Sequence, residues 1–140
     1  MTGEGKRILL IDDDPDMHDA IKMILEPLGY SVAGCFTAPE GLETLRADPP
    51  HLLLLDIMLS SPSEGFHVSA EMKQDPGLKD IPIIMISAIG HTMGMEYARE
   101  MGTEDIQADL FLEKPLEAAK LREAVAQVLR EHAERKGSTP

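Results

Sequence analysis

Four apolar runs in this chain each end on a polar residue of a different chemical kind. The runs cover residues 8–11, 52–55, 83–86 and 110–112, and the polar residues after them are Asp12 to Asp14, Asp56, Ser87 and, behind Glu113, Lys114. If the runs are neighbouring parallel strands, these side chains meet in one crevice, because ligands of parallel sheets bind at the carboxyl ends of the strands. Carboxylates, a hydroxyl and an ammonium group together suit a divalent cation and a phosphoryl group.

The elements that must position these groups alternate between strand and helix. Short continuous apolar runs are typical of parallel strands that are covered on both faces. Asp14 is the expected N-cap of the first helix, with Pro15 at an early helical position and Gly29 as its stop. The expected strands are 8–11, 30–36, 51–57, 81–87 and 109–113, and the expected helices are 15–28, 38–47, 65–74, 92–101 and 116–132. Since β-α-β crossovers are right-handed, this (βα)5 order predicts a doubly wound α/β sheet.

The composition of the chain argues against several classes of function. With 25 acidic and 13 basic side chains the formal net charge is −12, so we expect no direct binding to nucleic acid and none to an anionic membrane. Cys35 is the only cysteine, which excludes an intrachain disulfide and favours a reducing compartment, the cytoplasm. The length predicts one domain, and the first residues do not form a signal peptide or a membrane span. The five histidines lack metal-ligand spacing, so we interpret them as surface or core residues.

Four segments together resemble the signature of response regulator receiver domains. They are residues 8–16, 55–59, 83–88 and 111–115. Any one segment is a weak signal, because apolar runs that end in Asp are common, but all four in this order are specific. The resemblance covers residues 6–132 and implies a flavodoxin-like three-layer sandwich with a five-stranded parallel sheet of order 2-1-3-4-5. It also implies a receiver domain over residues 1–133, followed by a flexible tail over residues 134–140.

The residues at the strand ends fit the chemistry of such a phosphoacceptor. Asp56 stands alone at a strand end and can take a phosphoryl group as an acyl phosphate. Asp12 and Asp13, together with Asp56 and the backbone carbonyl of Met58, are the expected ligands of Mg²⁺. Lys114 is a compact cation that can pair with Asp56 at rest and with a phosphoryl oxygen afterwards.

Two further residues are expected to convert phosphorylation into a change of surface. The hydroxyl of Ser87 can donate to a phosphoryl oxygen, and by resemblance Phe111 lies at an aromatic switch position that turns inward when Ser87 moves. The surface affected is the fourth helix, fifth strand and fifth helix. Phe111 fits equally well as an inward core residue with no switching role.

The resemblance also implies the partners. The phosphoryl group would come from a histidine kinase or a phosphotransfer protein, and the output would be contact with a downstream protein or output domain, or a phosphorylation-dependent homodimer. We expect no enzyme activity beyond self-phosphorylation and slow self-dephosphorylation. By resemblance Met58 and Ile89 flank the path of the hydrolytic water, and because both are bulky and apolar they predict a long-lived phosphorylated form.

Two other function classes compete with this interpretation. In a HAD-like aspartyl-phosphate phosphohydrolase, Asp12 would be the nucleophile and Asp14 the acid, although the Thr or Val expected shortly after the pair is missing and Asp56 would have no role. The second alternative is a purely structural binding fold, in which the acidic pocket no longer has a function.

Two stretches depart from the receiver pattern. Residues 60–64 are expected to form a longer loop after Asp56, and residues 102–109 exceed the usual link between the fourth helix and the fifth strand by about five residues.

Overall fold

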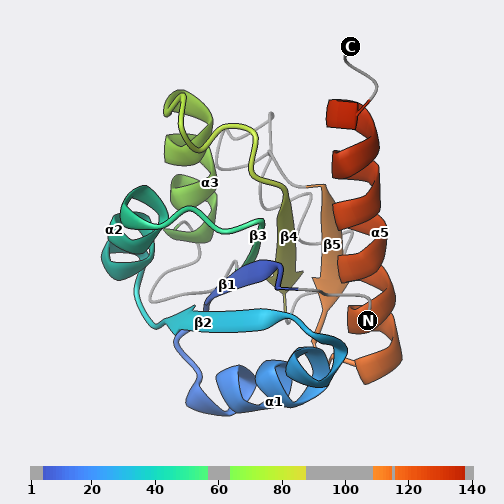
Figure 1. Cartoon of the computed structure of the whole chain (residues 1–140). Coiled ribbons are helices and arrows are strands. Elements are labelled where there is room, and N and C mark those ends of the chain that lie inside the picture. Colours follow the sequence, from blue (N-terminus) through green and yellow to red (C-terminus); the bar gives the residue numbers. More distant parts are fainter. Residues whose placement is uncertain (1–4, 57–63, 88–108, 115, 138–140) are drawn as a thin grey trace.

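The computed structural model describes residues 5–56, 64–87, 109–114 and 116–137. Within these ranges five parallel strands form one sheet in the order β2-β1-β3-β4-β5, as predicted (Figure 1). The strands are β1 (Arg7–Ile11), β2 (Ser31–Cys35), β3 (Leu52–Asp56), β4 (Ile83–Ser87) and β5 (Leu110–Glu113). The described helices are α1 (Pro15–Leu25), the short 3-10 helix η1 (Glu26–Leu28), α2 (Ala38–Ala47), α3 (Glu64–Gln74) and α5 (Ala118–Gly137).

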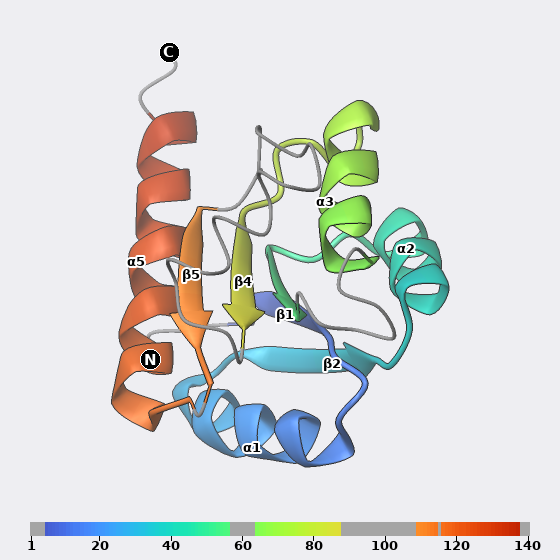
Figure 2. The same cartoon turned by 180° about the vertical axis from the view of Figure 1, so that it is seen from behind.

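Helices cover both faces of the sheet, which gives the predicted three layers. Helices α1 and α5 lie on one face and α2 and α3 on the other (Figures 1 and 2). Side chains alternate between the two faces of a strand, so β1 contributes side chains to two separate cores. Leu9 and Ile11 pack in the core beneath α2 and α3, whereas Ile8 and Leu10 pack in the core beneath α1 and α5.

The first helix begins as predicted and ends earlier. The Asp14 carboxylate accepts a hydrogen bond of 2.9 Å from the backbone N–H of Asp16, and Pro15 follows the cap. The predicted single helix over 15–28 stops at Leu25 and tightens into η1, because Pro27 has no N–H to continue the α-helical hydrogen bonds. Gly29, with φ of 99°, then ends the segment.

The last helix is longer than predicted. Helix α5 begins at Ala118 and continues to Gly137, five residues past the expected end at His132, since no glycine or proline interrupts residues 118–136. Residues 134–137 are therefore helical, and the expected flexible tail does not begin at residue 134. The expected helix over 92–101 lies outside the described residues. None of the described helices is long and apolar enough to cross a membrane.

Helix α2 lies close to β1 at Gly41. A Cβ atom added to Gly41 would lie 2.3 Å from Cδ1 and 2.8 Å from Cγ1 of Ile11, a side chain that is fully buried. The absence of a side chain at residue 41 thus sets how near the helix can lie to β1, the strand that ends just before Asp12 and Asp13.

We expect Gly41→Ala to lower the free energy of unfolding by about 1–3 kcal/mol, because overpacking outweighs the gain of about 1 kcal/mol in helix propensity. Urea denaturation measures the change. Its size should be smaller in an Ile11→Val background, which removes the nearest methyl group. A Gly41→Ala variant as stable as the wild type would contradict the close approach of α2 to β1.

Candidate functional site

Three carboxylates gather at the carboxyl ends of β1 and β3. In the sheet Ile11 is paired with Leu55, so the residues after them, Asp12 and Asp56, lie side by side. Asp12, Asp13 and Asp56 each offer one carboxylate oxygen, and these oxygens lie within 4.8 Å of one another. Asp12 and Asp56 are buried whereas Asp13 is exposed, so the cluster is closed on its inner side and open to solvent at Asp13.

One carboxylate oxygen of Asp12 accepts a hydrogen bond, and the other has no hydrogen-bond donor among the described residues. Its Oδ1 accepts a hydrogen bond of 2.9 Å from the backbone N–H of Asp14. Its Oδ2 lies 3.3 Å from Nζ of Lys114, close enough for an ion pair, but no donor among the described residues is aligned to form a hydrogen bond with it. A buried carboxylate oxygen in this state is costly, and a divalent cation, which prefers oxygen ligands, would satisfy it. The donor set therefore fits Mg²⁺.

Lys114 supplies the positive charge at the site. Its Nζ lies 3.4 Å from Oδ2 of Asp56 as well as 3.3 Å from Oδ2 of Asp12. Burial by itself lowers the pKa of Lys114, but the negative charges of Asp56 and Asp12 outweigh burial and raise its pKa above the ordinary value. The stability that comes from protonated Lys114 is therefore fully present below its unfolded-state pKa, and it is lost as the pH rises through its raised folded-state pKa.

Of the other predicted site residues, the structure describes Phe111 fully, Ser87 in part and Met58 not at all. Ser87 is the last residue of β4, paired with Glu113 of β5 and one position beyond the partner of Asp56, and the structure describes its backbone only. Met58 lies outside the described residues. Phe111, in β5, is partly buried and packs against the core beneath α2 and α3.

Asp14 does not join the acidic cluster. Its carboxylate caps α1 and is exposed, whereas Asp56, which the phosphohydrolase alternative leaves without a role, is buried in the cluster. The geometry thus favours Asp56 over the pair Asp12 and Asp14 as the centre of the chemistry.

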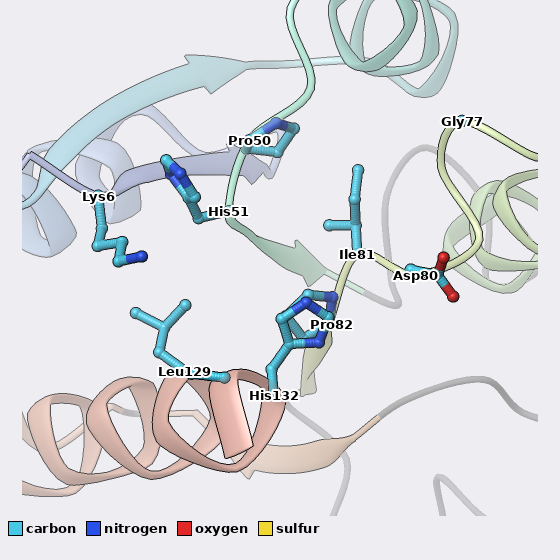
Figure 3. A pocket seen from close by; sticks show the side chains of 10 residues that line it. Lys6, Pro50, His51, Gly77, Asp80, Ile81, Pro82, Leu129 and His132 are labelled. Carbon is cyan, nitrogen blue, oxygen red and sulfur yellow. The ribbon is translucent and has the colours of Figure 1, made fainter. Parts of the chain in front are cut away.

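The acidic cluster is distinct from a cavity of about 470 Å³ at the opposite end of the sheet. Residues before β1, β3 and β4 and residues of α5 line this cavity, among them Lys6, His51, Pro82, Leu129 and His132 (Figure 3). Burial and the nearby charges of Lys6 and Arg7 lower the pKa of His51 below its ordinary value. None of the three clustered aspartates lines this cavity, so we place the functional site by its chemistry at the carboxyl ends of the strands.

Two bacterial transcriptional regulators are similar in sequence to most of this chain. The DNA-binding dual master transcriptional regulator RpaA of Synechocystis sp. is 32% identical over 124 residues, which make up 89% of this chain and 49% of RpaA. The phosphate regulon transcriptional regulatory protein PhoB of Pseudomonas aeruginosa is 31% identical over 126 residues, 90% of this chain and 52% of PhoB. The chain spans about half the length of these relatives.

Solved structures share the fold over nearly the whole chain. A CheY-like response regulator receiver domain protein from Methanospirillum hungatei superposes with a TM-score of 0.77 at 30% identity, covering 94% of this chain and 98% of that one. NtrX from Brucella abortus superposes with a TM-score of 0.81 at 27% identity, covering 95% of this chain and 29% of NtrX. The family model of the response regulator receiver domain matches residues 8–126. With this match over most of its length, and with the sheet order and strand-end residues described above, the chain belongs to the response regulator receiver domain family.

Proposed function

We propose that this chain is a phosphoacceptor module of a two-component phosphorelay and that Asp56 takes the phosphoryl group. The observation that carries the proposal is the buried Asp56 carboxylate, which ends β3 beside the Lys114 ammonium group and two further carboxylates. The phosphodonor in this proposal is a phosphohistidine of a histidine kinase or of a phosphotransfer protein.

In the transfer step, a carboxylate oxygen of Asp56 attacks the phosphorus atom of the phosphohistidine. The new O–P bond forms as the N–P bond breaks, and the imidazole nitrogen leaves with the electron pair. Catalysis of such a transfer depends mainly on positioning and on neutralising charge. Lys114, already 3.4 Å from Asp56, is placed to pair with a phosphoryl oxygen, and we assign the Ser87 hydroxyl as a second donor.

Asp12, Asp13 and Asp56, with the Met58 backbone carbonyl, are the residues that would hold Mg²⁺. The buried, unsatisfied Oδ2 of Asp12 supports this assignment. When bound, the cation would supply neutralising charge between the carboxylates and the phosphoryl oxygens. Asp13 is the exposed member of the cluster, so it lies on the side from which a cation can enter from solvent.

The output of the module, in this proposal, is a change of protein contact at β5 and α5. A phosphoryl group at Asp56 is sensed away from the crevice only through an element with two states, and Ser87 and Phe111 are the residues that we assign to it. Phe111 lies in the strand that leads to Lys114 and is only partly buried, so its side chain can repack. The partner is a downstream protein, an output domain or a second copy of this chain, with no direct contact to nucleic acid or membrane because of the charge of −12.

The first prediction concerns the site of phosphorylation. In the presence of Mg²⁺ and a small-molecule phosphodonor, the wild type should gain one acyl phosphate at Asp56, and Asp56→Asn should gain none. Mass spectrometry after labelling measures both. Asp14→Asn is the matched control, because asparagine also caps helices and this variant should label normally. Label on Asp12 would support the phosphohydrolase instead, and a wild type that takes no label would support the structural relic.

The second prediction concerns the metal. Mg²⁺ binds the folded protein and relieves repulsion among the three carboxylates, so at ten times its Kd it should stabilise the fold by about 1.4 kcal/mol. Thermal unfolding with Mg²⁺, compared with chelator at matched ionic strength, measures the shift in Tm. In Asp13→Asn the shift should shrink. Equal melting temperatures with and without Mg²⁺ would count against the metal site.

The third prediction concerns the output. Phe111→Ala should leave phosphorylation of Asp56 near the wild-type level and reduce the phosphorylation-dependent change in hydrogen exchange over α5. Leu112→Ala is the control, because Leu112 packs on the opposite face of β5 and should retain the change. If phosphorylation altered exchange in the wild type only around Asp13, Asp56 and Ser87, then β5 and α5 would not form the output surface.

A further inference from the structure

A buried histidine contacts the backbone of one residue of the acidic cluster. His18, in α1, is 6% exposed, and its Nε2 lies 2.7 Å from the backbone carbonyl oxygen of Asp12. A carbonyl oxygen can only accept, so Nε2 carries the proton and donates this hydrogen bond. The sequence, which shows no metal-ligand spacing among the histidines, assigns His18 to the surface or the core and gives no sign of this contact.

The contact with His18 is one of three hydrogen bonds that hold Asp12 in place. The backbone N–H of Asp12 donates to the carbonyl oxygen of Cys35 at 3.1 Å, and its Oδ1 accepts from the N–H of Asp14 at 2.9 Å. His18 holds the carbonyl oxygen. Three polar atoms of Asp12 are thus bound by β2, by the start of α1 and by the His18 ring, while Oδ2 faces Lys114.

The ring of His18 is itself held on two sides. Phe36 stacks on it with ring centroids 4.2 Å apart and an interplanar angle of 23°. Gly34 leaves the room that the ring occupies, because a Cβ atom at residue 34 would lie 2.1 Å from Nδ1 and 2.5 Å from Cε1 of His18. Gly34 lies in β2, and Phe36 is the first residue after this strand. The end of β2 and the residue that follows it therefore form the space that holds the ring.

We propose that His18 is a positioning residue for the metal site, an inference that rests on the Mg²⁺ site proposed above. The carbonyl group that His18 holds belongs to the peptide plane shared by Asp12 and Asp13, and a peptide plane moves as a unit. Fixing it sets the direction in which the chain presents both carboxylates. Without the imidazole, the buried carbonyl of Asp12 loses its donor, and the plane can turn to find another.

The test is a titration with Mg²⁺ alone, without phosphodonor, at a temperature where every variant is folded. His18→Leu removes the donor, and Gly34→Ala displaces the ring while keeping the histidine. Both should weaken Mg²⁺ binding about tenfold, as expected for groups that orient metal ligands. His18→Gln places an amide N–H near the position of Nε2 and should bind within about threefold of the wild type.

The matched control is Leu25→Val, which loses packing in the same helix, at the end away from the cluster. It should lower Tm and leave the Kd for Mg²⁺ unchanged. A His18→Leu variant with the wild-type Kd, or a His18→Gln variant as weak as His18→Leu, would overturn the positioning role while leaving the metal site intact. A wild type that binds no Mg²⁺ would overturn both proposals.

A second measurement does not depend on how the leucine variant folds. Long-range ¹⁵N–¹H correlation spectra of the wild type report which ring nitrogen of His18 carries the proton. We expect a proton on Nε2, the atom that faces the Asp12 carbonyl. A ring protonated on Nδ1 alone would overturn the inference.

Discussion

Excess negative charge at the carboxyl ends of β1 and β3 is the constraint on which the rest of the site depends. Asp12 and Asp56 are both buried, and like charges that share a site with little water repel each other strongly. Lys114 contributes one ammonium group between them. Together with Asp13 the cluster has three carboxylates and one ammonium group. The divalent cation that we propose for this site would supply the two positive charges that balance them.

The fold keeps these charges together because the strands that carry them cannot slide. All four leucines of β3 before Asp56 are fully buried, and both faces of the strand are covered by helices. A shift of one residue would exchange the side chains between the two cores and move Asp56 relative to Asp12. The stability of the apolar layers therefore supports an arrangement that would be unfavourable by itself. Helix α1 contributes side chains to one of these layers, and it also places His18 against the backbone carbonyl of Asp12.

The sequence was sufficient for the sheet and for the main residues of the site. Continuous apolar runs are characteristic of buried parallel strands, and their order predicted which strand ends would meet, so Asp12, Asp13, Asp56 and Lys114 could be brought together without coordinates. The interior of the helical segments was predictable, but their ends were less so. Pro27 lies inside an apolar periodicity that continues to Leu28, which hid the change to a 3-10 helix.

Two features could not be predicted from the sequence: the end of α5 and the contact made by His18. Glu134, Arg135 and Lys136 are polar, which favours a flexible tail, but these residue types are also good helix formers, and α5 continues to Gly137. The role of His18 depends on a bond to a backbone atom, which leaves no pattern of side-chain types. The one signal was indirect: Gly34 interrupts a strand at a position where a larger residue would otherwise be favoured.

Phe36 links the interior of the site to the solvent. Its side chain is 43% exposed on one side, and on the other it stacks on the ring that holds the Asp12 carbonyl. Two non-covalent contacts therefore separate a solvent-facing aromatic ring from a buried carboxylate residue. A substitution at residue 36, although it alters the surface, is also a change to the interior.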